Sequence, residues 1–306
     1  MKRYFFLILI GITLSAVSCK NETGTADSEP VYDAAVLQEA KVQSISPDSI
    51  PTGGFLFTSP KQMEIVGDSL LVVFNQEGQE QVGHVFSTQG KLLGSFGRLG
   101  KGHGEMIFPK NFSIGDDKET VYFFDEQTSS AVKIPIRDIL AGKENPTPVP
   151  RTAPEGFEDY RQSAAFYFDD NRYLALGFES KSRIMNVADG KITDNYTTYP
   201  LVADNEEHRW SIWNYVPRWG ISPDRKHLVI STYIGCLFEV FSLENGKIRQ
   251  KCLKAFYEPI YRVAPGAVPE WVTGTEETIY GFYALYCTDK SFWGVIAGEG
   301  HAHLND

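Results

Sequence analysis

The sequence has few cysteines, four in 306 residues: Cys19, Cys236, Cys252 and Cys287. Small domains that depend on disulfides use cysteine far more densely, and a structural metal site needs clustered ligands. If the turn at residues 245–246 is a two-residue hairpin, Cys252 faces Glu239 and not Cys236, which disfavours a disulfide there. The count therefore favours buried, free cysteines over a disulfide scaffold or a metal site.

Positive charge is also scarce. The sequence has 29 Lys and Arg against 39 Asp and Glu, a net charge of −10. Loss of Lys2 and Arg3 with the leader described below gives −10 − 2 = −12. Proteins that bind nucleic acid or an anionic membrane surface through charge carry a basic excess. We therefore expect no nucleic-acid partner.

The only long apolar run lies at the N-terminus and has the features of a signal peptide. Lys2 and Arg3 precede a run from Phe5 to Leu14, which is shorter than the roughly 20 residues that span a bilayer. Residues 16–19, Ala-Val-Ser-Cys, resemble a bacterial lipobox, in which the cysteine is lipidated and becomes the new N-terminus. We expect a leader at 1–18, lipidation at Cys19, a flexible tether at 19–35 and a folded domain at 36–306.

This N-terminal signal predicts a lipoprotein in the outer membrane of a Gram-negative bacterium. We expect the protein to contact the membrane only through its lipid. Ordinary secretion is the alternative.

Helical periodicity is nearly absent after the tether, whereas short apolar runs bounded by turn residues recur. In five places an acidic turn precedes an apolar strand, starting at Asp68, Asp117, Asp170, Asp224 and Glu277. Successive starts differ by 49, 53, 54 and 53 residues, and glycine-containing hairpin signals follow most of them. A repeat of about 50 residues made of strands and turns is the signature of a β-propeller blade. The predicted fold is an all-β propeller with five recognisable units.

Residues 96–114, FGRLGKGHGEMIFPKNFSI, contain glycines and basic residues but lack the pattern of a phosphate-binding loop. Gly102 stands where Ser or Thr is required after Lys101, and a strand is expected where a helix is needed. Pro60-Lys-Gln-Met-Glu-Ile and Pro109-Lys-Asn-Phe-Ser-Ile lie 49 residues apart, so the loop should lead from one blade to the next. We interpret its glycines as turn residues.

Three stretches resemble the six-bladed TolB-like and NHL-like propellers of bacterial lipoproteins. Residues 97–106 with Phe108-Pro109 resemble the family's Gly-x-Gly-Pro-Gly-Glu-Phe and proline pattern, with His103 where proline is usual and Met106 in place of phenylalanine. Residues 218–224 resemble the Ser-Pro-Asp blade motif, and residues 280–286 resemble a late strand of such lipoproteins. The resemblance covers about residues 36–290 and implies a fold more than an activity.

The fifth unit lacks an outer hairpin after Asp289, and a sixth has no sequence of its own. Either residues 36–57 supply strands to close the ring, or the chain is shortened at its C-terminus. We favour shortening, which predicts an imperfectly closed ring with an exposed strand edge.

Catalytic and metal-binding constellations are missing from the sequence. The paired acidic residues 116–117, 169–170 and 276–277 occupy the same turn of different blades, where carboxylates accept backbone N–H bonds and lie far apart. His84, His103, His208 and His227 fall at unlike blade positions, and a His-x-His at 301–303 lacks further ligands. No Gly-x-Ser-x-Gly occurs. We expect no cofactor and no metal.

The connections between blades are long and aromatic, and they carry the candidate ligand-binding residues. Aromatic rings beside guanidinium groups can stack and form bidentate hydrogen bonds, although the same rings could instead fill the wedges between blades. The candidates are Arg98, Lys101, His103, Arg209, Trp210, Trp213, Tyr215, Arg218, Tyr261, Arg262 and Trp271.

The predicted function is that of a membrane-tethered binding or scaffold protein, not an enzyme, whose loop face binds a protein, peptide or glycan. A lyase or hydrolase that uses the propeller channel is the first alternative, and a degenerate, shortened relative is the second.

Overall fold

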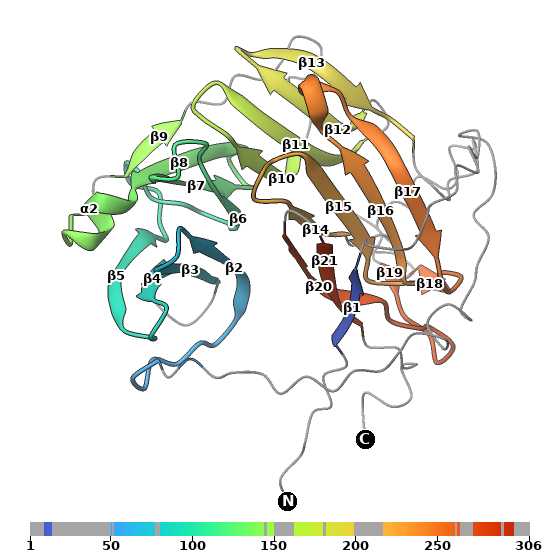
Figure 1. Cartoon of the computed structure of the whole chain (residues 1–306), viewed down its shortest axis with the longest axis horizontal. Coiled ribbons are helices and arrows are strands. Elements are labelled where there is room, and N and C mark those ends of the chain that lie inside the picture. The colour runs from blue at the N-terminus through green and yellow to red at the C-terminus, as the bar shows by residue number, and fades with distance from the viewer. Residues whose placement is uncertain are drawn as a thin grey trace, which may run out of the picture. The chain divides into compact units, whose positions relative to one another are not determined.

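The computed structural model describes residues 9–13, 50, 52–76, 80–143, 146–149, 162–179, 182–198, 217–260, 262–263, 272–288 and 291–296. The chain divides into two compact units. We call Pro47–Thr197 the middle unit, and Met1–Ser46 together with Thr198–Asp306 the terminal unit. Strands dominate both units, which confirms the all-β prediction (Figure 1).

The middle unit contains three four-stranded antiparallel sheets in which the spatial order follows the sequence order. The first sheet is β2 (Pro60–Val66), β3 (Leu70–Asn75), β4 (Gln81–Ser87) and β5 (Leu92–Arg98). The second is β6 (Pro109–Ile114), β7 (Thr120–Asp125), β8 (Ser130–Pro135) and β9 (Thr147–Val149), with helix α2 (Ile136–Leu140) before β9. The third is β10 (Gln162–Tyr167), β11 (Arg172–Glu179), β12 (Ser182–Ala188) and β13 (Lys191–Tyr196). Four-stranded meanders of this kind are propeller blades.

The turns form where the sequence supplies residues that tolerate positive φ. Between β12 and β13, Asp189 and Gly190 have φ of 50° and 70°, and Ala188 pairs with Lys191. This is the two-residue type I′ geometry that matches the strand twist. Between β6 and β7, the Asp117 carboxylate accepts the N–H groups of Glu119 and Thr120, at 2.9 and 3.0 Å. The acidic residue thus closes the turn that starts the repeat's apolar strand, as expected.

Apolar sheet faces pack against one another within the middle unit. Phe74 of the first sheet and Phe123 of the second meet edge to face, with ring centroids 5.3 Å apart. Between the second and third sheets, Tyr122 stacks on Tyr167 at 5.6 Å, and within the third sheet Tyr167 stacks on Tyr173 at 5.0 Å. Each sheet therefore buries its face against its neighbour in sequence, which is why the repeat needs adjacent copies.

Side-chain amides join the first strands of neighbouring sheets. Gln62 on β2 donates to the carbonyl of Phe112 at 2.8 Å and accepts its N–H at 3.0 Å. Asn111 on β6 occupies the equivalent place and makes the same pair of bonds to Ala165 on β10, at 2.9 and 3.3 Å. A backbone bulge directly precedes both amides. These bonds fix the register of one sheet against the next.

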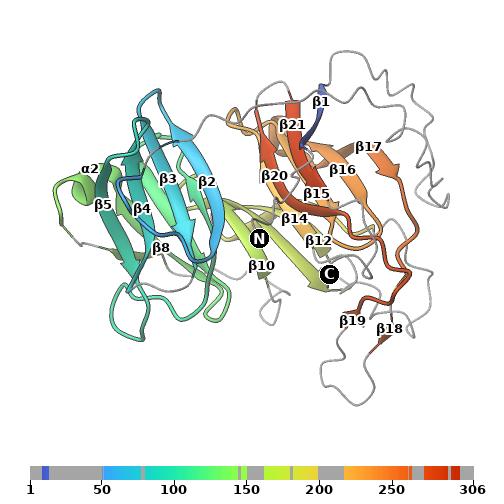
Figure 2. The same cartoon turned by 90° about the horizontal axis from the view of Figure 1, so that it is seen from below.

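The terminal unit holds a fourth four-stranded sheet: β14 (Pro217–Ile221), β15 (His227–Thr232), β16 (Leu237–Ser242) and β17 (Arg249–Ala255). Its other strands are β18 (Arg262–Val263) with β19 (Val272–Thr273), and a three-stranded sheet in the order β1 (Leu9–Thr13), β21 (Ser291–Ile296), β20 (Phe282–Cys287). Figure 2 shows β1 beside β21.

The turn at Asn245 and Gly246 is not the predicted two-residue hairpin. Both residues have positive φ, but they lie in a six-residue loop, because Ser242 pairs with Arg249. A bulge after Val240 then sets Cys252 opposite Val240, so the expected pairing of Cys252 with Glu239 is wrong. Three of the cysteines are described, and none of these three forms a disulfide: Cys236 and Cys287 are buried, and Cys252 is half-buried.

The fifth repeat departs from the pattern of the other four. After the turn at 276–277, Tyr280 makes an isolated bridge to Ile234, and the strand begins at Phe282. Its sheet has three strands, and residues 9–13 supply the third. No described helix is long and apolar enough to cross a bilayer.

Candidate functional site

The glycine-rich loop between β5 and β6 binds its own backbone and one of its own carboxylates. Met106 donates to the carbonyl of Arg98 and accepts from the N–H of Gly100, both at 2.9 Å. The carboxylate of Glu105 accepts the N–H of Gly102 at 2.7 Å. That N–H is therefore committed to Glu105 and not held open for an anion, and the structure agrees with the interpretation of these glycines as turn residues.

Asp125, at the end of β7, anchors the exit of this loop. Its buried carboxylate accepts the N–H groups of Ile107 and of Phe108, the latter at 3.0 Å, and the N–H of Thr128 at 3.0 Å. Asn75 at the end of β3 does the same for Ser59, at 2.8 Å. Side chains at the ends of β3 and β7 thus hold the segments that lead into β2 and β6.

Three predicted ligand-binding residues lie at the end of β5 or on this loop. Arg98 forms an ion pair with Glu80 at 2.8 Å. Lys101 and His103 are exposed. Arg98, Lys101 and His103 belong to the middle unit, whereas Arg218 and Arg262 belong to the terminal unit.

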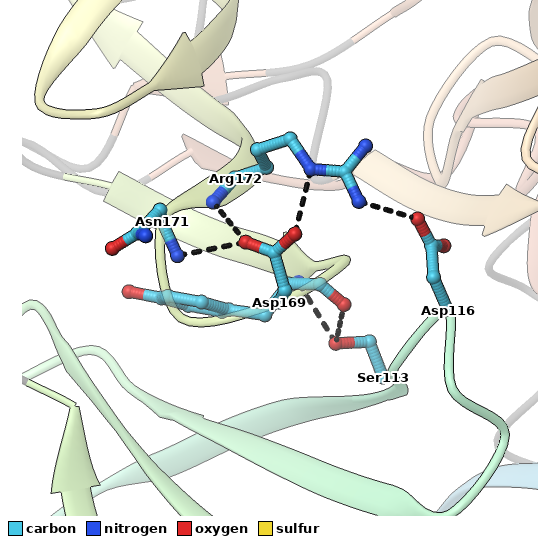
Figure 3. Close-up of polar contacts among 6 residues, drawn as sticks. Ser113, Asp116, Asp169, Asn171 and Arg172 are labelled. Atoms are coloured by element: carbon cyan, nitrogen blue, oxygen red, sulfur yellow. Dashed lines mark hydrogen bonds and ion pairs between the residues drawn. The ribbon is translucent and has the colours of Figure 1, made fainter.

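The acidic turns of the second and third sheets converge on one arginine (Figure 3). Arg172 binds Asp116 through Nη2 at 2.8 Å and Asp169 through Nε at 2.6 Å. The prediction that equivalent acidic turns lie far apart is wrong for these two, because stacking of adjacent sheets brings their ends together. The structural role expected for the acidic residues agrees with these contacts.

Asp169 shows how the turn residue keeps its charge. Its Oδ1 accepts the N–H groups of Asn171 and Arg172, each at 2.8 Å (Figure 3). Burial raises the pKa of Asp169, but the bonds from Arg172 and the backbone outweigh it, so the pKa lies below its ordinary value. A carboxylate tied in this way is a poor general acid at neutral pH.

Arg218 at the start of β14 sits among three tyrosines, which we call the Arg218 cluster. Its Nε donates to the carbonyl of Tyr283 at 2.9 Å, and its guanidinium lies 5.4 Å from the centroid of the Tyr233 ring. The Tyr233 ring contacts Tyr280 at 4.9 Å and Tyr283 at 5.1 Å. This is a cation–π arrangement with a fixed guanidinium orientation.

Two backbone pairings bring these residues together. The N–H of Gly281 donates to the carbonyl of Tyr233 at 2.6 Å, and that of Gly235 donates to the carbonyl of Ile279 at 3.1 Å. The turn between β15 and β16 is thereby joined to the segment that enters β20. Gly281 is required for this contact, since a Cβ there would lie 2.6 Å from the carbonyl oxygen of Thr232.

Burial shapes the electrostatics of the cluster. Burial lowers the pKa of Arg218 below its ordinary value, and the neighbouring Tyr233 and Tyr283 offset only part of this shift. Burial, followed by the hydrogen bond with Tyr283, raises the pKa of Tyr233. The attraction between a half-buried guanidinium and a nearby carboxylate is less screened than the attraction between two fully exposed groups. Tyr283 is 37% exposed, so the cluster reaches the surface.

Several predicted residues fall outside the described part of the chain, and their predictions stand untested: Cys19, Arg209, Trp210, Trp213, Tyr215, Tyr261 and Trp271. Arg262 lies in β18, but its side chain is not described. Sequence reasoning found Arg218 and missed Tyr233, Tyr280 and Tyr283. Tyr280 and Tyr283 had been assigned only to a repeat strand.

Histidines and acidic residues do not gather around a metal position in the part of the chain that the structure describes. His84 is buried, and its Nδ1 lies 2.9 Å from Ser95 Oγ. Its ring packs on Phe55 at 4.6 Å, and burial lowers its pKa to about 4. His84 is therefore a neutral core residue at physiological pH.

The four meander sheets define the class: this is a β-propeller protein. The family described as TolB-like 6-blade propeller-like matches residues 40–305, and the chain belongs to that family. A comparison with curated proteins found no significant match.

Solved structures with related folds include a protein from Bacteroides fragilis described as exported, at 12% identity and a TM-score of 0.44. That match covers 68% of this chain and 53% of the other. A protein from Agrobacterium tumefaciens described as TolB matches at 11% identity and a TM-score of 0.35, covering 62% and 63%. The chain thus spans about half the length of the first of these structures.

Proposed function

We propose that the protein is an extracytoplasmic binding module, tethered to the outer membrane through Cys19, whose loop face binds a polypeptide or glycan that carries a carboxylate. The Arg218 cluster is the observation that carries this proposal. It presents a half-buried guanidinium, oriented by the Tyr283 carbonyl, beside tyrosine rings, and one of the rings is exposed.

The chemistry of the cluster favours one kind of ligand group. A carboxylate pairs with a guanidinium in charge-assisted, often bidentate hydrogen bonds. Tyrosine rings beside it offer flat, rigid contact area to an apolar side chain or to a sugar face. A peptide carboxylate and an acidic sugar both provide this combination, so the ligand class is defined by a carboxylate next to a flat apolar surface.

The test probes both sources of that chemistry. The purified chain is applied to an array of immobilised peptides with free carboxylates and to an array of neutral and acidic bacterial oligosaccharides. Arg218→Lys keeps the charge but loses the planar fork, and it should weaken binding about tenfold or more. Arg249→Gln removes an exposed arginine from β17 of the same unit and is the matched control.

A bound peptide with no bound sugar identifies a polypeptide ligand, and the reverse identifies a glycan. Equal binding by Arg218→Lys and the parent chain would refute the role of the cluster. A thermal melt of each variant checks that the fold is retained, because Arg218 also binds the backbone of Tyr283.

The membrane tether is tested separately. Cys19→Ser should move the protein from the membrane fraction to the soluble periplasmic fraction, and it should abolish incorporation of labelled palmitate. Retention of the variant in the membrane would contradict lipid anchoring through Cys19.

A further inference from the structure

Strand β21 differs in composition from the outer strands of the four complete sheets. In the whole chain β21 is the middle strand of its sheet, between β20 and β1. Strand β1 runs antiparallel to it, from Leu9 opposite Val295 to Thr13 opposite Ser291. Residues 9–13 lie inside the expected leader, so a chain processed at Cys19 lacks β1.

The outer strands of the four complete sheets carry the residues that usually protect an exposed edge. Charged side chains and proline on an edge discourage pairing with another chain. These residues are Arg98 on β5, Pro148 on β9, Lys191 and Asp194 on β13, and Arg249, Lys251 and Lys254 on β17. Each of these strands is therefore built to end its sheet.

Strand β21, Ser-Phe-Trp-Gly-Val-Ile, carries no charge and no proline. Phe, Trp, Val and Ile are strong strand formers, and a flat apolar edge of this composition readily pairs with another strand. Gly294 at its middle leaves room for the Phe282 ring of β20, because a Cβ there would come within 2.4 Å of that ring. Among the outer strands, β21 therefore lacks the charge and proline that protect the other four.

Without β1, the described part of this sheet is β20 and β21 alone. Two strands are marginally stable in water, and the edge backbone groups of β21 would lose their partners. A third strand would restore both the pairing and the stability.

We infer that, in the processed chain, the edge of β21 is a strand-accepting site for an extended apolar segment of a partner polypeptide, added antiparallel in the place of β1. This site is separate from the Arg218 cluster and rests on the proposed removal of the leader. The segment resembles Leu-Ile-Gly-Ile-Thr in length and character. A small residue such as Gly11 fits opposite Trp293, where β1 places it. Main-chain hydrogen bonds would provide the affinity, as in other cases of strand addition.

The experiment uses the processed protein in detergent and a fluorescent peptide with the sequence of residues 8–14, flanked by lysines for solubility. Intact mass first establishes whether the N-terminus is Cys19. Fluorescence anisotropy then measures peptide binding, and hydrogen exchange reports on residues 291–296. The control peptide carries proline in place of Ile10 and Ile12 and cannot form a strand ladder.

Val295→Lys places a charge on the β21 edge, and Asn195→Lys makes the same change on the outer strand β13. We expect saturable binding with slowed exchange at residues 291–296, a loss of about tenfold or more in Val295→Lys, and no change in Asn195→Lys. The proline peptide should not bind to the parent chain.

Three results would overturn the inference. The first is an intact mass showing that the purified protein retains residues 9–13, since the edge of β21 is then filled by the chain's own strand β1. The second is no binding of the peptide, and the third is equal binding of both peptides by the parent chain. None of these bears on carboxylate binding by the Arg218 cluster, which the arrays test independently.

Discussion

Replacement of Asn111 by alanine tests whether side-chain amides hold neighbouring sheets together in the middle unit. Asn111 is buried, and its amide both donates to and accepts from the backbone of Ala165, which is buried as well. Truncation removes two hydrogen bonds and leaves the N–H and C=O of Ala165 without these partners. It also leaves a small cavity at the contact between β6 and β10.

The expected cost follows from the groups left unpaired. A buried polar group that loses its partner costs about 1–3 kcal/mol, so two such groups cost about 2–6 kcal/mol before relaxation. Some of this returns if the strands shift or water enters, and we expect a loss of about 2–4 kcal/mol in the free energy of unfolding. Lys61→Ala, an exposed change on β2, should stay within about 0.5 kcal/mol of the parent chain.

Urea unfolding followed by two probes measures this loss. All five tryptophans lie outside residues 47–197: Trp210, Trp213, Trp219, Trp271 and Trp293. Their fluorescence therefore reports on the terminal unit, whereas circular dichroism reports on both units. Asn111→Ala should lower the midpoint seen by circular dichroism. A change no larger than that of Lys61→Ala would refute the claim that this amide joins the sheets.

Three further predictions concern pH, the glycine loop and the thiols. Because burial lowers the pKa of His84 to about 4 from 6.5, the unfolded state binds more protons between these values, so stability should fall by about 3 kcal/mol as pH drops from 7 to 4. His84→Gln should lose this component of the pH dependence in urea titrations, and an unchanged slope would count against it. Gly104→Ala should cost more than Gly142→Ala in the same assay. Both glycines have positive φ, which costs about 1–2 kcal/mol for alanine, but only at Gly104 would a Cβ meet another group, Pro146, at 2.6 Å. In a Cys19→Ser background, a thiol reagent should label Cys252 first. Burial raises the pKa of Cys236 and Cys287 to about 12, and labelling of either before Cys252 would contradict their placement.

The repeat could be predicted from sequence because each copy needs the same local chemistry. Asp117 and Asp169 accept N–H groups two and three residues ahead, and Asp224 accepts the N–H two ahead. In the third unit the turn carboxylate is therefore that of Asp169 and not that of Asp170, the predicted start of the repeat. A carboxylate at that place recurs because the turn requires it. The sheets that follow in the middle unit were predictable for the same reason.

Hairpin length and strand register were less predictable. Positive φ at residues 245–246 is a local property and was foreseen, but the six-residue loop around it depends on where the ladder between β16 and β17 resumes. One bulge then moves every later partner by one residue, which is why the partner of Cys252 was wrong. The amides of Gln62 and Asn111 did leave a signal, since each stands two residues after the proline of its repeat.

The Arg218 cluster could not be predicted from one sequence. Its members come from residues 218, 233, 280 and 283, and only the pairing of the turn after β15 with the segment before β20 brings them together. The sequence indicated that arginine and aromatic side chains would lie together, but it did not identify the tyrosines that contact Arg218. Trp219, which follows Arg218 in β14, is half-buried and pairs with Ile230 within the fourth sheet.

The two proposed binding surfaces lie where the repeat changes, and this follows from what a repeat position must do. Within the complete sheets, acidic turns, amides and apolar faces are committed to the neighbouring sheet, and substitutions there act on stability. The fifth unit departs from the pattern: Tyr280 pairs with a turn instead of a strand, and β21 carries no charge and no proline. Residues that depart from the repeat pattern are not required for packing between repeats. Natural sequences depart from local structural rules mainly at functional sites. Substitutions at Arg218 and Val295 should therefore affect binding more than stability, whereas Asn111 should show the reverse.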